Sequence, residues 1–271
     1  MPELPEVETI VRGLATAVLG KQIAAARVDL PKVALASGGR VFANEVVGEE
    51  IAAIKRRGKF VVLALRSGRS LVVHLRMTGR LIVQNGGQSK LHPYTHVALD
   101  FMDGSRLCFA DVRQFGRMRL VEPEELWASE LGYEPLSEDF TAERLAGMLA
   151  GRSSPVKVLL LDQRRIAGIG NIYACEALWE ARICPGAVCR ALRKPAIRRL
   201  HGAVRGVLHR AIAMRGSTVD DYVDAEGLRG GFQNFLSVYG REGKPCSRCG
   251  RPIVRSVIAQ RGTWWCRKCQ K

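Results

Sequence analysis

The chain has 271 residues and a mass of 29.8 kDa, with 47% hydrophobic and 25% charged residues, a formal net charge of +16 and a pI near 10.0. These proportions are typical of folded globular proteins, so they exclude a disordered chain, a collagen and a coiled coil. No run of about 18 apolar residues occurs, and the N-terminal MPELPEVET has carboxylates where a secretory signal has basic residues. The sequence therefore predicts a cytoplasmic protein without a membrane span.

The positive charge is concentrated in the second half of the chain. Residues 1–150 contain 19 Lys and Arg against 18 Asp and Glu, whereas residues 151–271 contain 23 against 8. A surface this basic attracts polyanions, because binding to a phosphate backbone releases condensed counterions. Nucleic acid is the predicted partner, and the alternatives are a solvated basic surface or one that meets anionic lipid.

The first half begins with a helix and continues as β-structure. Apolar residues recur at helical spacing from Leu4 to Val18, acidic residues occupy the first turns, and Gly20 follows the last apolar position. From about residue 22 to 120 the pattern changes to short β-rich runs separated by glycine turns. The clearest runs are Phe60–Leu65, Ser70–Leu75, Val97–Phe101 and Arg106–Ala110. This region is predicted to be an antiparallel β-sandwich or barrel.

The second half is predicted to be helical before it ends in a cysteine-rich module. An acidic stretch at 122–151 leads to helical patterns at about 155–166, 171–182, 195–214 and 218–224, and then to a glycine-rich stretch at 227–231. The fold class is α+β. We predict three domains, with boundaries at 1–130, 131–235 and 236–271.

Four of the eight cysteines lie in the last 26 residues as two Cys-x-x-Cys pairs. Their spacing allows four thiolates to bind one structural zinc ion tetrahedrally, and the ligands are Cys246, Cys249, Cys266 and Cys269. Two redox dithiols are the alternative, but no thioredoxin-like βαβ pattern precedes them. The segment between the pairs is rich in arginine, which is typical of a β-hairpin finger that presents cations to phosphate.

The segment Ile166–Ala174 joins two apolar helices through a glycine turn and places Asn171 at a helix N-terminus. Free backbone N–H groups and the helix dipole favour an anion there, and the asparagine amide adds a donor. The alternative is a plain helix connection. The basic charge of this half favours phosphate binding.

The second residue, Pro2, carries a secondary amine once Met1 is removed. An α-amino group titrates near pH 8, so part of it is nucleophilic at neutral pH. Attack on a sugar C1′ gives an iminium ion that acidifies the C2′ hydrogen and permits elimination, and Glu3 and Glu6 are placed to transfer protons. The alternative is ordinary capping, with proline at a helix start and glutamates in the first turn.

Six motifs occur together and in order along the whole chain. They are PELPEVET at 2–9, RRGKF at 56–60, HLRMTG at 74–79, DVRQFG at 111–116, AGIGNIYA at 167–174 and the four-cysteine finger. With this set the chain strongly resembles bacterial formamidopyrimidine-DNA glycosylase. The resemblance implies a β-sandwich, a helix-two-turn-helix domain and a β-hairpin zinc finger with one Zn²⁺.

The activity implied by the resemblance is base excision repair by a monomeric enzyme associated with the bacterial nucleoid. Its partner is double-stranded DNA containing oxidised bases or abasic sites. Such an enzyme is both a DNA glycosylase and an abasic-site lyase: it removes 8-oxoguanine and formamidopyrimidines and then cleaves the strand by β,δ-elimination.

The resemblance also implies five catalytic residues. Pro2 is the nucleophile that forms the Schiff base, Glu3 is the general acid, and Glu6 supports both. Lys59 lies against phosphate near the lesion and assists β-elimination, although a solvated lysine is the alternative. Arg261 clamps the phosphates that flank the lesion and assists δ-elimination.

Chemistry on a base requires that the base leave the stack and that a wedge fill the gap. The resemblance assigns this wedge to Met77, Arg113 and Phe115, with Arg113 hydrogen-bonded to the orphan cytosine; without it, the Met and the Phe read as core residues. The loop formed by 216–222 with 227–231 would close over the flipped base. Four further residues are placed at DNA phosphates, near the lesion or beside the wedge: His74, Arg152, Lys157 and Asn171.

Two stretches depart from the family pattern. One loop has the sequence Lys-His-Asp-His in many relatives and His92-Pro-Tyr94-Thr-His96 in this chain. Tyr94 therefore replaces a histidine that contacts DNA in those relatives. Asp220 and Asp221 stand where relatives often have a basic residue. Lesion preference is therefore left open.

Two other functions compete with this interpretation. An endonuclease-VIII-like glycosylase would act on oxidised pyrimidines, but the PELPEV start and the complete wedge argue against it. A non-catalytic zinc-finger DNA-binding protein would need no free Pro2 amine, and the glutamates beside that amine argue against it.

Overall fold

The computed structural model describes residues 1–36, 40–85, 90–218 and 222–271. The chain divides into two compact units. Unit 1 consists of residues 1–129 and 215–231, and unit 2 consists of residues 130–214 and 232–271. The chain therefore passes from unit 2 back to unit 1 and out again near its end.

Unit 1 contains one long helix and two β-sheets. The four-stranded sheet has the order β1-β7-β8-β6, and the five-stranded sheet has the order β2-β9-β5-β4-β3. All pairings are antiparallel except that of β2 with β9. The elements are α1 (Leu4–Val18), β1 (Ile23–Val28), η1 (Pro31–Val33), β2 (Ala34–Ala36), α2 (Phe42–Val46), β3 (Ile51–Arg57), β4 (Phe60–Leu65), β5 (Ser70–His74), β6 (Gly79–Gln84), β7 (Thr95–Phe101), β8 (Arg106–Asp111) and β9 (Arg117–Val121).

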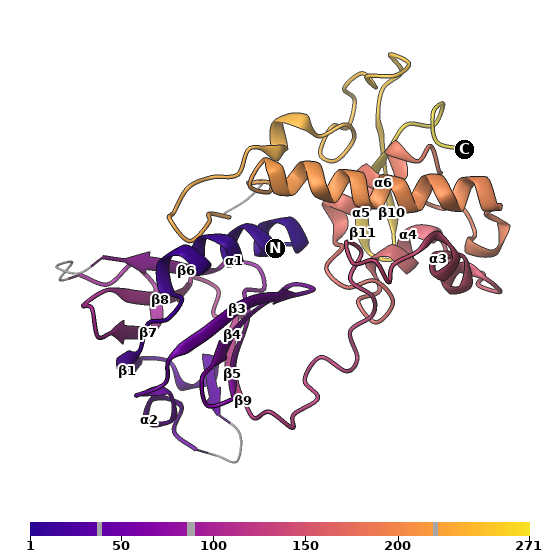
Figure 1. Ribbon diagram of the computed structural model, residues 1–271. Coiled ribbons are helices and arrows are strands. Elements are labelled where there is room, and N and C mark those ends of the chain that lie inside the picture. Colours follow the sequence, from indigo (N-terminus) through magenta and orange to yellow (C-terminus); the bar gives the residue numbers. More distant parts are fainter. Residues whose placement is uncertain (37–39, 86–89, 219–221) are drawn as a thin grey trace. The chain divides into compact units, whose positions relative to one another are not determined.

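Helix α1 packs against β3 and β4 of one sheet and β6 of the other (Figure 1). Its apolar face, which includes Val7, Ile10 and Leu14, is buried in a core shared with both sheets. Tyr222 and Ala225, from the returning segment, lie in the same core. Burial of this face stabilises the helix, and the returning segment completes the packing.

Unit 2 is built around a buried helix, α5, that packs against α4, α6 and β11. Residues 172–179 of α5 are all buried, so the helix forms the centre of the unit rather than a surface layer. The strands β10 and β11 form an antiparallel hairpin. The elements are α3 (Ala142–Leu149), α4 (Val156–Leu161), α5 (Asn171–Glu180), η3 (Cys189–Ala191), α6 (Lys194–Ala213), η4 (Phe232–Phe235), β10 (Val254–Ile258) and β11 (Arg261–Trp265).

The predicted fold class is confirmed: an N-terminal helix with a β-sandwich, a helical region and a C-terminal hairpin. Helix α3 was not predicted, because it lies in the acidic stretch interpreted as a connection. The predicted helix at 218–224 is wrong for its described residues, 218 and 222–224, which are irregular. The Thr218 hydroxyl donates to the Tyr222 carbonyl, and the Asp224 carboxylate accepts from the Glu226 N–H. The division at 130 and 235 stays a prediction.

Among the helices of the described residues, none is both long enough and apolar enough to cross a bilayer.

Candidate functional site

The N-terminal residues Pro2, Glu3 and Glu6 are all buried at the start of α1. The carboxylate of Glu6 accepts a hydrogen bond from the backbone N–H of Glu3 at 2.8 Å, and its other oxygen accepts one from the N–H of Ser217 at 2.7 Å. The Tyr222 hydroxyl donates to the Glu6 carbonyl at 3.3 Å. Glu6 therefore links the N-terminus to the returning segment within unit 1.

Gly216 allows this close approach. Its φ of +78° lies in the left-handed region, and a Cβ atom there would be 2.7 Å from a Glu6 carboxylate oxygen. Burial, together with the nearby Glu6 carboxylate, raises the pKa of Tyr222 well above its usual value. The phenol thus stays protonated and can donate its hydrogen bond. Residues 219–221, which include Asp220 and Asp221, lie outside the described residues.

Lys59 is buried in the turn between β3 and β4, next to Gly58, whose φ is +56°. His74, at the end of β5, pairs with Phe60 of β4, and the two ring centroids are 4.6 Å apart. Burial lowers the pKa of His74 to about 3, assisted by the positive charges of Arg76 and Lys59. The neutral imidazole accepts a hydrogen bond from the Arg76 N–H at 3.0 Å.

The predicted wedge residues are exposed at strand ends of unit 1. The exposed fractions are 40% for Met77 and 51% for Phe115, and the Arg113 guanidinium lies 4.9 Å from the centre of the Phe115 ring. Tyr94 is also exposed, in the turn that precedes β7. Large apolar side chains held in water at one place are typical of a contact surface.

In unit 2 two of the predicted DNA contacts, Lys157 and Asn171, meet the finger hairpin that carries Arg261. Ala259 and Gln260 have φ of +50° and +59°, which is the tight turn expected of a two-residue hairpin, and Arg261 is exposed just after it. The Lys157 ammonium donates to the Gly262 carbonyl at 3.1 Å and to the Thr263 hydroxyl at 2.7 Å.

Asn171, the first residue of α5, donates its side-chain amide to the same Gly262 carbonyl at 3.0 Å. Its amide oxygen is buried and lacks a protein partner within the described part of the chain. Lys157 is fully buried, and thus holds the hairpin from within. Arg152, further along the same unit, is partly exposed and donates to the Met148 carbonyl. The structure therefore brings Lys157, Asn171 and the Arg261 strand together.

The four cysteines predicted to bind zinc do converge. Their sulfur atoms all lie within 4.8 Å of one another, with 3.5 Å between Cys249 and Cys266 and 4.0 Å between Cys246 and Cys269. Sulfurs bound at about 2.3 Å to a tetrahedral ion are about 3.8 Å apart, so these residues fit one zinc ion. The ion would use all four thiolates and would support folding rather than catalysis.

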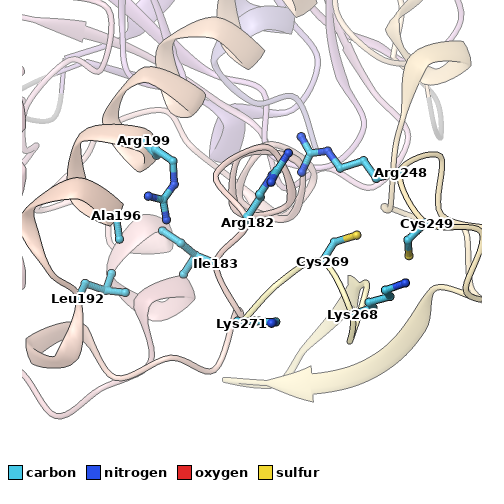
Figure 2. A pocket seen from close by; sticks show the side chains of 10 residues that line it. All are labelled: Arg182, Ile183, Leu192, Ala196, Arg199, Arg248, Cys249, Lys268, Cys269 and Lys271. Atoms are coloured by element: carbon cyan, nitrogen blue, oxygen red, sulfur yellow. The ribbon is translucent and has the colours of Figure 1, made fainter.

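A cavity of about 770 Å³ lies beside this cluster. Figure 2 shows Cys249 and Cys269 on its wall together with Arg182, Arg199 and other side chains. The cavity lies near the C-terminal end of α5, where two of its lining residues, Arg248 and Arg199, donate to the Trp179 and Ala181 carbonyls, whereas Asn171 starts that helix. Because ten helical residues span about 15 Å, the cavity is separate from the Asn171 contacts.

Two buried carboxylates were missed by the sequence analysis. Glu176 in α5 accepts hydrogen bonds, each of 2.9 Å, from the backbone N–H groups of Ser237, Val238 and Tyr239, which lead into the finger. Asp111, at the end of β8, accepts three hydrogen bonds from the turns that bear the wedge residues. The sequence signal for Glu176 was an acidic residue inside an otherwise apolar helix. The signal for Asp111 was its place as the first residue of DVRQFG.

Comparison with protein families matches three successive parts of the chain. Residues 1–118 match the formamidopyrimidine-DNA glycosylase N-terminal domain, and residues 131–223 match the H2TH domain of the same enzyme. Residues 243–271 match the zinc finger found in FPG and IleRS.

Curated relatives and solved structures agree with these matches. A formamidopyrimidine-DNA glycosylase from Chloroflexus aggregans is 47% identical over 273 aligned positions, which cover 100% of this chain and 98% of the relative. A structure of the MutM (Fpg) protein from Thermus thermophilus has a TM-score of 0.88 at 42% identity, covering 99% of this chain and 98% of the other. A Lactococcus lactis Fpg variant in complex with DNA containing Fapy-dG has a TM-score of 0.91 at 34% identity, with both chains fully covered. The chain therefore belongs to the formamidopyrimidine-DNA glycosylase family.

Proposed function

We propose that this protein is a base excision repair enzyme that removes oxidised purines, 8-oxoguanine and formamidopyrimidines, from duplex DNA and then cleaves the abasic strand. The family membership supports this, as do the Lactococcus lactis structures with Fapy-dG DNA and with abasic DNA. The observation that carries the proposal is the Glu6 carboxylate, which joins the Glu3 N–H, beside the Pro2 nitrogen, to the segment around Ser217.

In the proposed reaction, removal of Met1 leaves Pro2 with a secondary amine. Its nitrogen lone pair attacks the sugar C1′, and the bond from C1′ to the damaged base breaks, with the electron pair leaving on the base. The base takes up the proton that the amine loses. The sugar ring then opens to give an iminium ion, and Glu3 supplies the proton that ring opening requires. A buried site favours this step because the amine is not strongly hydrated.

Glu6 acts differently from Glu3. Both of its carboxylate oxygens accept backbone hydrogen bonds, so the Glu6 side chain holds two segments of the chain in place. We infer that Glu6 positions the nucleophile and that Glu3 transfers protons. This division of roles predicts that the two glutamates give different kinetic defects.

Strand cleavage follows from the iminium ion. Loss of the C2′ proton and breakage of the C3′–O bond release the 3′ side. In the second elimination the C4′ proton is lost and the C5′–O bond breaks. Lys59, which is buried in the turn between β3 and β4, is proposed to assist the first elimination. Arg261 is proposed to bind the flanking phosphates and assist the second elimination.

The proposed DNA interface combines the wedge with phosphate contacts. Met77, Arg113 and Phe115 would fill the space left by the flipped base, with Tyr94 beside them. His74 is neutral and supports the turn of Met77. The remaining proposed contacts, on the second unit, are Arg152, Asn171 and Arg261. Lys157 is fully buried and would act indirectly, by holding the hairpin that presents Arg261.

A second substrate class has one observation in its favour. Another Lactococcus lactis Fpg structure contains DNA with an oxidised pyrimidine, at a TM-score of 0.90 and 34% identity. An endonuclease-VIII-like preference for oxidised pyrimidines is therefore the second candidate. A cytoplasmic, nucleoid-associated monomer stays a prediction.

Borohydride trapping tests the proposed function. The Met-processed protein is mixed with a duplex that contains 8-oxoguanine opposite cytosine, and reduction of the iminium should give a covalent protein–DNA band that maps to Pro2. A form that retains Met1, in which the Pro2 nitrogen is an amide, is the control, and it should lose the band that maps to Pro2 while still binding DNA. A band only with an oxidised pyrimidine would favour the second candidate, and no band with any lesion or abasic site would leave a non-catalytic DNA-binding protein.

A further inference from the structure

Asp111 stands where three turns of unit 1 meet. Its carboxylate accepts hydrogen bonds from the Thr78 hydroxyl, from the Arg113 N–H at 3.2 Å and from the Gly116 N–H at 2.7 Å. Thr78 follows Met77, and Phe115 precedes Gly116. One carboxylate therefore joins the turn of Met77 to the turn of Arg113 and Phe115.

The main chain of Asp111 reaches the third turn. Its N–H donates to the Tyr94 carbonyl at 3.1 Å, and its carbonyl oxygen lies 2.8 Å from the His96 ring nitrogen Nε2. The turns that carry the exposed wedge residues and Tyr94 are thus all hydrogen-bonded to Asp111, which is buried and only 1% exposed.

Each of the three turns holds a non-glycine residue in the left-handed region. The φ values are +54° for Arg76, +61° for Tyr94 and +58° for Gln114. Such backbone is disfavoured by sterics and persists only where surrounding contacts fix it, often at functional sites. Its repetition around Asp111 indicates that the turns are held against their local preference.

Two glycines make room for this arrangement. A Cβ atom on Gly116 would lie 2.6 Å from the Phe109 ring and 3.1 Å from an Asp111 carboxylate oxygen. A Cβ atom on Gly79 would lie 2.4 Å from the Leu75 carbonyl oxygen, which accepts the hydrogen bond that closes the Met77 turn. The Asp111 carboxylate is buried, and hydrogen bonds from Thr78, Arg113 and Gly116 satisfy it there.

We propose that Asp111 is a positioning residue that fixes the turn of Met77 relative to the turn of Arg113 and Phe115, so that these side chains enter the duplex as one rigid wedge. The inference rests on the proposed function, because extrusion of a base is what requires a wedge. It also predicts which step depends on the residue. Removal of an intact base needs the wedge, whereas cleavage at a preformed abasic site has no base to extrude.

The test compares two single-turnover rates in each variant: excision of 8-oxoguanine opposite cytosine, and cleavage of the same duplex with an abasic site. Thr78→Val keeps the carboxylate but removes the hydroxyl that donates to it and that accepts a hydrogen bond from the Arg113 N–H at 3.2 Å. Asp111→Asn changes the carboxylate itself. Because small misplacements of reacting groups cost up to about a hundredfold in rate, we expect excision to fall about 10- to 100-fold, while abasic cleavage stays within about threefold of wild type.

The controls are Thr78→Ser, which retains the hydroxyl and should restore excision, and Asp100→Asn on the neighbouring strand β7, whose carboxylate pairs with Arg106. The proposal is overturned if Thr78→Val excises at the wild-type rate, or if both rates fall by the same factor. Thr78→Val decides the matter if Asp111→Asn does not fold.

A non-catalytic readout separates this inference from the proposed function. A duplex with 2-aminopurine beside an abasic-site analogue becomes fluorescent when a wedge unstacks it. If the wild-type protein cleaves neither duplex, the proposed function fails, and fluorescence still decides the role of Asp111. Equal signals from Thr78→Val and wild type would overturn it, and a lost signal restored in Thr78→Ser would support it.

Discussion

The side-chain ammonium of Lys157 lies 3.1 Å from the carbonyl oxygen of Gly262, the residue that follows Arg261 in the finger hairpin. The lysine is fully buried, and Asn171 donates to the same carbonyl. A cation that the sequence places at DNA phosphate thus supports, from inside unit 2, the strand that presents an exposed arginine.

Lys157→Met should weaken DNA binding by removing this support. The change leaves the Thr263 hydroxyl without its donor and frees the hairpin, and loss of a charge-assisted hydrogen bond costs about 1.5–3 kcal/mol, or roughly tenfold or more in affinity. Fluorescence anisotropy with an undamaged duplex at fixed salt measures the effect. Lys194→Met, an exposed lysine at the start of α6, is the matched control, and an equal loss in both variants would contradict the prediction.

Replacement of His74 should alter the acid stability of the protein. The unfolded imidazole binds a proton near pH 6.5 and the folded one near pH 3, so between these values the unfolded chain binds more protons. The free energy of unfolding therefore falls as the pH decreases from about 6.5, by up to about 1.4 kcal/mol per pH unit. In urea unfolding between pH 4.5 and 7, His74→Gln should show a shallower pH dependence than wild type. The exposed His209→Gln should match wild type, and identical slopes for all three proteins would count against the assignment.

Loss of a zinc ligand should unfold the finger and weaken DNA binding together. Metal affinity in such modules is folding free energy, so Cys249→Ser is expected to lose bound zinc and the hairpin order at once. Zinc content by metal analysis and duplex affinity are measured on the same sample. Cys184→Ser, outside the four-cysteine cluster of the same unit, should retain both properties. Normal binding after verified zinc loss would refute the link.

Truncation of Leu14 should destabilise unit 1. Its side chain is fully buried in α1, in the core shared with both sheets, and Leu→Ala at such sites costs about 2–5 kcal/mol. Chemical denaturation measures the loss. Leu19→Ala, five residues along and half exposed, should change stability by less than about 0.5 kcal/mol. A similar loss in both variants would show that α1 does not contribute through this face.

Features that depend on local spacing could be predicted from the sequence. The four zinc ligands follow from two Cys-x-x-Cys pairs, and helix α1 follows from its apolar periodicity. The bond between Glu6 and Ser217 joins residues 211 positions apart and requires the chain to return to unit 1, which no local pattern indicates. Burial of Lys157 likewise depends on the packing of the hairpin against the helices of unit 2.

Asp111 illustrates a further limit. Its importance depends on strand register, because only the pairing of Gly79 with Asp111 brings Thr78 to the carboxylate. In the motif DVRQFG, the exposed residues Arg113 and Phe115 were predicted to act. No role was predicted for Asp111, the acid that supports them. Buried polar residues with several backbone donors are recognised only once tertiary structure is known.

The return of residues 215–231 to unit 1 sets an order for biosynthesis. The core of unit 1 contains Tyr222 and Ala225, so the first 129 residues to leave the ribosome lack two of their packing partners. At about 5–20 residues per second, the partners follow several seconds later. The N-terminal sandwich is thus begun first but completed only after most of unit 2 has been synthesised. A nascent chain that stalls before Tyr222 and Ala225 emerge exposes an unfinished core to chaperones and proteases.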